Sequence, residues 1–176
     1  MKKDLRNTDK TEIKGWLKEQ GEPVFRIDQI EDWLWRRPVS YISEMSNLSK
    51  SLRDKLEQTF YLDRLETVHT LKSKDGTHKM AFGLDDGKHV EGVLIPSKER
   101  LTACISTQVG CKMGCKFCAT GQMGFGRNLS AGEIYLQAWY LNDLAEKQFG
   151  KRLSNIVVMG MGEPLDNFYN TMRAMN

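Results

Sequence analysis

The stretch that decides the fold is Cys111-Lys112-Met113-Gly114-Cys115-Lys116-Phe117-Cys118, which places three cysteines in a C-x3-C-x2-C spacing. Three thiolates on one tight loop can hold three corners of a cubane iron–sulfur cluster, whose usual complement is four cysteines. One iron is then left without a protein ligand, and a substrate or cofactor can bind the metal there. Because this spacing is more specific than a lone C-x-x-C pair, we predict a cluster-binding loop.

A zinc site is the alternative interpretation of the same cysteines, with Cys104 as the fourth ligand. Structural zinc needs four ligands closed into a tetrahedron, and C-x6-C-x3-C-x2-C lacks the paired spacing of zinc ribbons. The histidines all lie upstream of the cysteines and resemble ordinary strand residues: His69, His78 and His89. The spacing therefore favours the iron–sulfur interpretation, and the zinc interpretation stays open as the competitor.

The sequence on either side of the cysteines predicts a strand, a loop, a helix and a second strand. A strand over residues 101–108 leads into a loop over 109–128, which holds five glycines and so needs unusual backbone angles. Ser130-Ala131-Gly132-Glu133 is a capping box that begins a helix, and Gly150 ends it. Residues 155–159 form a continuous apolar strand, as expected for a parallel strand covered on both faces. We predict one right-handed βαβ unit, which cannot close a barrel by itself.

A second motif, Met159-Gly160-Met161-Gly162-Glu163-Pro164, stands at the carboxyl end of the second of these strands. Ligands of α/β sheets bind at that end. Glycines let the backbone approach a ligand closely, and Glu163 can pair with an ammonium group. Taken alone, the segment is equally typical of a turn that ends a strand.

Residues 1–62 show the spacing of short amphipathic helices. Gly21 and Pro38 end the first two helices, and Ser49 is a plausible N-cap of the third. The apolar residues that set the spacing are Ile13, Trp16 and Leu17, then Ile27, Ile30, Trp33 and Leu34, and finally Leu48, Leu52, Leu56 and Phe60.

The segment between these helices and the cysteines changes to the period of strands. Residues 67–71 and 79–82 flank a turn at Asp75-Gly76, and Asp85-Asp86-Gly87 makes another turn before a strand over 89–95. Runs of this kind separated by Asp-Gly turns predict antiparallel hairpins.

Composition excludes several classes of protein. The 176 residues are 40% hydrophobic and 28% charged, which is enough apolar content to build a core. No apolar run approaches the roughly 18 residues of a membrane span, so no membrane association is expected. Residues 1–7 are polar with no apolar stretch behind them, so we predict no secretory signal and a cytoplasmic location. In a reducing compartment, four cysteines are better interpreted as ligands or reactive thiols than as disulfides.

The net charge of +3 is unevenly placed. Residues 97–176 hold 9 basic and 6 acidic side chains, which accounts for all of it. Within residues 98–127, five cations face a single acid, Glu99, and such an excess can attract a polyanion. Trp35-Arg36-Arg37 is the helical segment that we expect to face a partner, because Trp35 leaves the apolar stripe and two cations follow it.

The cysteine loop resembles the signature of the radical S-adenosylmethionine (SAM) superfamily, including the aromatic Phe117 before its last cysteine. The resemblance implies that Cys111, Cys115 and Cys118 ligate a [4Fe-4S] cluster whose free iron binds SAM, and that one electron cleaves SAM to a 5′-deoxyadenosyl radical. It also implies that the second motif, with Gly162 and Glu163, holds the amino group of SAM.

A narrower resemblance covers essentially the whole chain and is to the bacterial dual-specificity 23S rRNA/tRNA adenine-C2 methyltransferases. The motifs that carry it occur in order along the chain: Phe25-Arg26-Ile27-Asp28-Gln29-Ile30, Glu44-Met45-Ser46-Asn47-Leu48-Ser49, Val90-Glu91-Gly92-Val93-Leu94-Ile95-Pro96, Ser106-Thr107-Gln108-Val109-Gly110-Cys111, Gly124-Phe125-Gly126-Arg127-Asn128-Leu129 and Gly160-Met161-Gly162-Glu163-Pro164. The resemblance implies an α/β protein with a helical RNA-binding accessory domain over 1–62, a β hairpin linker over 63–97, and the first βαβ part of a radical SAM (β/α) barrel over 98–176.

The resemblance also implies a mechanism. One SAM methylates a cysteine near the C-terminus, a second yields the radical that activates this methyl group, and the resulting carbon radical adds to adenine C2. Cys104 matches a second cysteine that resolves the adduct, and Glu91 matches the proton acceptor. Glu91 has some support of its own, because on a strand it shares a face with Val93 and Ile95, an odd place for a solvated acid.

The chain departs from the family pattern by ending at Asn176, with all four cysteines already assigned. A barrel takes roughly 200 residues or more, so we expect a fragment that is catalytically incomplete alone. Two other functions stay open: a related methyltransferase that acts at adenine C8 of 23S rRNA and confers antibiotic resistance, and a zinc-stabilised RNA-binding module without catalysis. The expected partners are 23S rRNA, tRNA and an electron donor such as flavodoxin, and the expected state is a monomer.

Overall fold

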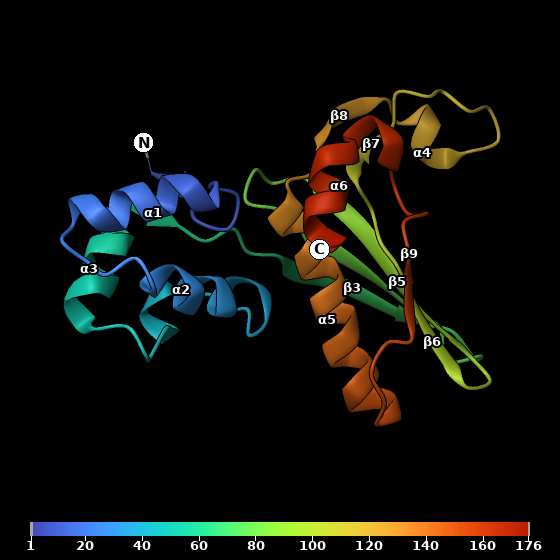
Figure 1. Cartoon of the computed structure of the whole chain (residues 1–176). Helices are drawn as coiled ribbons and strands as arrows, with labels where there is room; N and C mark the ends of the chain where they lie inside the picture. Colours follow the sequence, from blue (N-terminus) through green and yellow to red (C-terminus); the bar gives the residue numbers. More distant parts are fainter. Residues whose placement is uncertain (1, 176) are drawn as a thin grey trace. The chain divides into compact units, whose positions relative to one another are not determined.

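A computed structural model describes residues 2–175 and divides the chain into two units. The first unit ends at Asp63 and the second begins at Arg64 (Figure 1). None of the helices in the described residues is long and apolar enough to cross a membrane.

The first unit is helical, as the apolar spacing predicts. Its helices are α1 (Lys10–Glu19), α2 (Arg26–Trp35), the short η1 (Ile42–Glu44) and α3 (Lys50–Thr59), and β1 (Lys3–Asp4) pairs in parallel with β2 (Phe60–Tyr61). Ser49 caps α3 by accepting the backbone N–H of Leu52 at 3.2 Å, so the predicted N-cap is confirmed. Apolar residues of all three α-helices form one buried core, including Ile13, Leu17, Ile27, Ile30, Leu34, Leu52 and Leu56.

Two polar residues near the N-terminus, Arg6 and Asp4, form a hydrogen-bonded cluster that we call the clasp. Arg6 is only 1% exposed, and its guanidinium donates hydrogen bonds to the carbonyl oxygens of Leu34 (3.3 Å), Val39 (3.3 Å) and Asp63 (2.9 Å). Asp4 accepts the backbone N–H of Asp63 at 3.1 Å. The polar N-terminal residues are therefore part of the structural core, which their composition does not indicate.

The second unit is built on a five-stranded sheet in the order β3-β4-β5-β6-β9. Its strands are β3 (Glu66–Lys72), β4 (His78–Gly83), β5 (His89–Ser97), β6 (Arg100–Cys104) and β9 (Asn155–Val157). The first four are antiparallel neighbours, and β9 pairs in parallel with β6. The turn signals predict the β3–β4 and β4–β5 pairings, whereas the antiparallel pairing of β5 with β6 is a finding of the structure. Helix α5 (Ala131–Phe149) connects these two strands, so the predicted strand–helix–strand unit is confirmed.

Helix α5 covers one face of this sheet and leaves the other face open (Figure 1). The buried face and the helix share one apolar core, which includes Met80, Phe82, Val90, Leu94, Leu101, Ala103, Ile134, Leu141 and Ala145. The predicted coverage of residues 155–159 on both faces is wrong: Ile156 is 39% exposed and Met159 79% exposed. The reason is that β9 is a three-residue strand at the edge of the sheet.

The segment predicted as one strand, 101–108, divides in the structure. Strand β6 ends at Cys104, and Gln108 begins a second, two-stranded sheet in which β7 (Gln108–Gly110) pairs antiparallel with β8 (Phe125–Asn128). The predicted loop 109–128 thus contains a hairpin and the short helix α4 (Ala119–Gln122). Gly110 permits this pairing, because its φ is +73° and a Cβ there would lie 1.9 Å from the carbonyl oxygen of Gly124.

Candidate functional site

The three predicted cluster ligands lie on the connection between β7 and β8. Cys111 is buried, Cys115 and Cys118 are half-buried, and all three are free thiols. Backbone hydrogen bonds shape the loop, from Cys111 N–H to the carbonyl of Gly124 at 2.9 Å and from Cys118 N–H to that of Cys115 at 3.0 Å. Phe117 is 92% exposed, so its ring is available to a ligand and does not pack in the core.

The donor set on this loop fits an iron–sulfur cluster. The loop offers three soft sulfur ligands and no carboxylate or imidazole between them. The backbone N–H of Gly121 hydrogen-bonds to the thiol of Cys118 and lowers its pKa, which favours the thiolate that binds metal. The thiols are not gathered, however: within residues 2–175 no group of three or more Cys, His, Asp or Glu side chains is placed to hold a metal ion.

A buried polar hub follows β6 at its carboxyl end. The hydroxyl of Ser106 donates to the carbonyl of Glu91 (2.6 Å) and accepts the backbone N–H of Met161 (2.8 Å). The side-chain amide of Gln137, on α5, accepts the backbone N–H of Ser106 (2.9 Å) and donates to its carbonyl (3.0 Å). Sheet, helix and the turn after β9 are therefore fixed to one another at this residue.

Gln108 continues the hub toward the second motif. Its side-chain oxygen accepts the backbone N–H of Glu163 at 2.9 Å, and its NH2 group donates to Asn128 and to Asp166, each at 2.8 Å. Sequence reasoning assigned no role to Gln108 or Gln137. The sequence marks Gln108 only as part of the motif at residues 106–111, and the structure adds that the polar run Ser106-Thr107-Gln108 is fully buried.

The residues predicted to hold the amino group of SAM lie in the turn that Gln108 supports. Gly162 has a φ of +100°, and a Cβ there would lie 2.6 Å from the Cβ of Gln108, so only glycine fits. Glu163 is half-buried, and its carboxylate accepts the backbone N–H of Leu165 (3.1 Å) at the start of η2 (Pro164–Asn167). The carboxylate thus has a defined position beside the hub.

Glu91 and Cys104 lie on the open face of the sheet. Cys104 is the cross-strand partner of Val93, which stands two residues from Glu91 and therefore on the same face. Burial raises the pKa of the Cys104 thiol. The two residues that the resemblance implies to be catalytic are thus neighbours on adjacent strands, β5 and β6.

The independent argument for Glu91 from its apolar neighbours is wrong. Val93 is only half-buried and Ile95 is 37% exposed, because this face is the one that α5 does not cover. The Glu91 carboxylate forms a 2.7 Å ion pair with Lys79 on β4, and both side chains are 46% exposed. A paired acid on an open face needs no special explanation.

The basic stretch 98–127 is partly neutralised within the chain. The guanidinium of Arg127 forms two hydrogen bonds with the buried carboxylate of Glu133 (2.7 and 2.8 Å) and a third with Asp86 (2.7 Å). The bond from Arg127 holds the pKa of Asp86 far below its usual range. Lys112 pairs with Asp166 at 2.6 Å. The surface is thus less positive than the count of cations suggests.

The Trp35-Arg36-Arg37 segment is only partly as expected. Arg36 and Arg37 are exposed, with 84% and 67% of their side chains accessible. Trp35 is instead half-buried against the core of the first unit, and Arg37 pairs with Asp32 at 2.7 Å. The two cations remain accessible to a partner, whereas the indole is largely a packing residue.

Comparison with known proteins agrees with this architecture. The family description "Ribosomal RNA large subunit methyltransferase N-terminal domain" matches residues 3–62. The chain is 45% identical over 175 residues to a probable dual-specificity RNA methyltransferase RlmN of Cytophaga hutchinsonii, covering 99% of this chain and 48% of that protein. It is 47% identical over 163 residues to the Clostridium perfringens protein of the same description, covering 92% of this chain and 46% of that protein.

A solved structure shows the same fold. The crystal structure of a radical SAM methyltransferase from Sphaerobacter thermophilus superposes with a TM-score of 0.84 at 40% identity, covering 98% of this chain and 51% of that one. The chain thus spans about half the length of the curated relatives it matches.

Proposed function

Because this chain belongs to the RlmN family of dual-specificity RNA methyltransferases, within the radical SAM enzymes, we propose that it forms the N-terminal half of an enzyme that methylates C2 of adenine in 23S rRNA and tRNA. The observation that carries the proposal is the 45% identity to one such protein along 99% of the chain. The first unit would then contact RNA, with Arg36 and Arg37 as its exposed cations. A phosphate backbone is the natural partner of such cations.

We further propose that Cys111, Cys115 and Cys118 hold a [4Fe-4S] cluster, with SAM beside Phe117, Gly162 and Glu163. Adenine C2 is a poor nucleophile, and the bound cluster and SAM would supply the one-electron chemistry that its methylation requires. The residues of the chain bind and orient these groups. Gln108 fixes the backbone N–H of Glu163 and so orients a carboxylate that can receive an ammonium group.

On the open face, we propose Glu91 as the proton acceptor and Cys104 as the thiol that resolves the protein–RNA adduct. Two contacts fix the position of Glu91: Ser106 binds its backbone carbonyl and Lys79 pairs with its carboxylate. Cys104 stands on the adjacent strand of the same face. Both side chains can therefore reach one reacting group placed over this face.

Anaerobic reconstitution of the 176-residue protein tests the cluster. Iron and sulfide should be bound in near-equal amounts, and Cys115→Ala should abolish binding because two thiolates do not retain a cubane. Cys104→Ala is the matched control and should leave the cluster intact. Loss of metal in Cys104→Ala, or recovery of zinc instead of iron, would contradict the proposal and favour the four-cysteine zinc site.

The reaction is tested in the natural protein that carries this sequence. Mass spectrometry of digested RNA should detect C2-methyladenosine after anaerobic incubation with SAM and a reductant. Glu91→Gln and Cys104→Ala should each remove this product while the cluster is retained. Methylation at C8 instead of C2 would place the protein in the alternative class of methyltransferase.

A further inference from the structure

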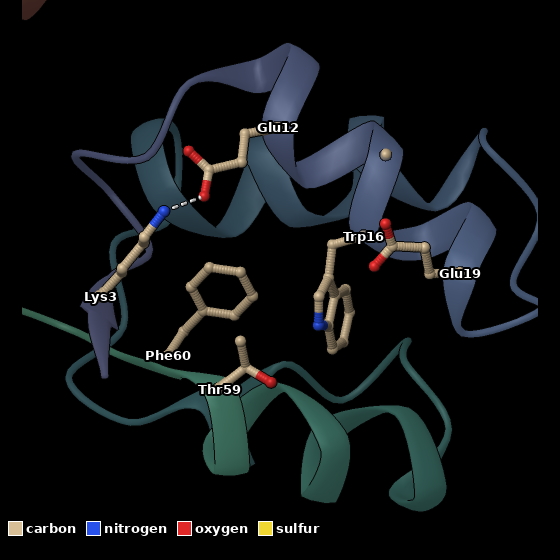
Figure 2. A pocket seen from close by; sticks show the side chains of 7 residues that line it. Lys3, Glu12, Trp16, Glu19, Thr59 and Phe60 are labelled. Atoms are coloured by element: carbon tan, nitrogen blue, oxygen red, sulfur yellow. Dashed lines mark hydrogen bonds and ion pairs between the residues drawn. The ribbon is translucent and has the colours of Figure 1, made fainter. Parts of the chain in front are cut away.

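The first unit contains a pocket that belongs to none of the sites described above. Its volume is about 470 Å³, and it lies between α1, the end of α3 and the strand β1 (Figure 2). Its lining residues are Lys3, Glu12, Gly15, Trp16, Glu19, Thr59 and Phe60. Four of them, at positions 12, 15, 16 and 19, follow the i, i+3, i+4, i+7 spacing and so form one face of α1.

Gly15 is the residue that needs an explanation. It lies in the interior of α1, where glycine destabilises a helix relative to alanine. Its φ is not positive, and a Cβ built there would meet nothing within 4 Å, so neither the backbone conformation nor packing requires glycine. The missing side chain does keep the wall of the pocket open, as expected where a ligand approaches the backbone closely.

The remaining side chains of the pocket define the chemistry of that ligand. The indole of Trp16 packs edge to face on Phe60, with ring centroids 5.4 Å apart, and is held at one side of the pocket (Figure 2). Lys3 forms an ion pair with Glu12. The carboxylate of Glu19 is exposed and makes no hydrogen bond or ion pair within the described residues.

The pocket therefore combines an aromatic ring with one carboxylate that lacks a partner. Its formal charge is −1, because Lys3 is neutralised by Glu12 and Glu19 is not. Tryptophan is the best aromatic partner of a cation, and a planar guanidinium can stack on an indole while it donates two hydrogen bonds to a carboxylate.

We propose that this pocket binds an arginine side chain from a basic segment of a partner protein. The guanidinium stacks on Trp16 and pairs with Glu19, and the aliphatic part of the side chain passes over Gly15. A nucleotide is disfavoured, because its phosphate would approach a pocket that is already negative. The proposal concerns a protein contact and does not depend on the RNA methylation proposed above.

The test titrates the 176-residue protein with the peptide acetyl-Arg-Gly-Arg-Gly-amide at low ionic strength and follows the indole N–H resonance of Trp16 by NMR. A saturable shift is expected. The same peptide with citrulline in place of arginine has nearly the same shape without the charge, and should bind at least about fivefold more weakly, the size of one exposed ion pair. Equal binding of the two peptides would overturn the proposal.

Three variants locate the contact. Glu19→Gln should weaken arginine-peptide binding about fivefold, and Gly15→Leu should abolish it while the melting temperature is maintained, because leucine is a strong helix former. Glu57→Gln, which removes an exposed carboxylate of α3 outside the pocket, is the matched control and should leave affinity unchanged. A single-stranded oligoribonucleotide that saturates the Trp16 shift and displaces the peptide would instead assign the pocket to RNA.

Discussion

The two units bury their apolar cores in different ways. The helical unit surrounds its apolar core with three α-helices and locks it with Arg6, whose three partners all lie within the same 63 residues. The sheet unit buries one face under α5 and leaves the other open, with Glu91 and Cys104 on it. The helical unit thus encloses its apolar residues among helices, whereas the sheet unit leaves the side chains of one sheet face accessible.

Buried polar groups also differ between the units. The helical unit uses a charged side chain, Arg6, on three carbonyls. The hub of the sheet unit uses neutral groups, with the side-chain amide of Gln137 pairing with the backbone of Ser106, although this unit also buries the Glu133 carboxylate against Arg127. Replacing a buried cation that donates hydrogen bonds should lower the free energy of unfolding more than replacing a buried neutral amide does, because hydrogen bonds to charged groups are stronger. Mutations at these positions therefore test how far the comparison holds.

The largest effect is expected at the clasp. Arg6→Met should lower the free energy of unfolding by about 3 kcal/mol or more, because three carbonyls lose their donor in a buried setting. Urea unfolding followed by tryptophan fluorescence reports mainly on this unit, which holds three of the four tryptophans: Trp16, Trp33 and Trp35. Arg36→Met, at a side chain that is 84% accessible, is the control and should change little. Equal effects of the two substitutions would show that the hydrogen bonds of Arg6 do not stabilise the helical unit more than an exposed arginine does.

A smaller effect is expected at the neutral hub. Gln137→Leu should cost about 2 kcal/mol, since the N–H and carbonyl of Ser106 are left buried without the amide. Hydrogen exchange at the Ser106 amide should accelerate accordingly. Gln148→Leu changes an exposed glutamine of the same helix and should leave both measurements unaltered. Unchanged hydrogen exchange at Ser106 would show that the side-chain amide of Gln137 does not stabilise the backbone of Ser106.

Breaking the ion pair between Arg127 and Asp86 should lower the free energy of unfolding by a smaller amount, and this amount should depend on pH. The pKa of Asp86 is lowered chiefly by the hydrogen bond from Arg127, so ionised Asp86 stabilises the fold above its ordinary pKa, and this contribution is lost as the pH falls below about 4. Asp86→Asn should cost less than about 1 kcal/mol at pH 7, because the pair is partly exposed.

The pH series supplies the control for this substitution. Asparagine can still accept the backbone N–H of Lys88, so the change isolates the charge. The difference between the natural protein and Asp86→Asn, measured by urea unfolding, should shrink from pH 6 to pH 2.5. A constant difference would mean that the turn, and not the ionised carboxylate, is responsible.

The smallest predicted change in stability is a gain and not a loss. Gly15→Ala should raise the stability of the helical unit by about 0.5–1 kcal/mol, because alanine is the better helix former and nothing stands within 4 Å of its Cβ. Thermal unfolding measures the gain. Gly21→Ala is the contrasting variant and should destabilise, because the φ of Gly21 is +72°. A loss of stability in Gly15→Ala would show that this glycine has a structural role.

Much of the fold follows from periodicity and turn chemistry. The helices of the first unit, the Ser130 capping box, the hairpins and the parallel pairing of β6 with β9 could all be predicted, because each depends on local spacing or on a single connection. The β7–β8 hairpin could not, since it depends on the fit of Gly110 against the carbonyl of Gly124. The exposure of β9 could not either, because an apolar run does not reveal how many neighbours its strand has.

The candidate site divides in the same way. The cysteine loop is recognisable from spacing. Cys104 is indicated only by the resemblance to a family, and so in the end is Glu91, because the argument from its apolar neighbours fails. Gln108 and Gln137 act through hydrogen bonds to distant backbone groups, such as that of Gln108 with Glu163, 55 residues away. Sequence patterns carry no information on such contacts. For the same reason the sequence does not predict the pairing of Arg127 with Glu133 and Asp86, and a count of cations overstates the positive charge of this surface.

The clasp of Arg6 also has a consequence for the time course of synthesis. Residue 6 leaves the ribosome long before its partner at residue 63, and β1 needs β2 at residues 60–61. The helices can form as they emerge, but the core cannot lock until this last segment has been made. Once it has, every partner of the clasp is present, and the helical unit can complete its folding while the sheet strands are still being translated.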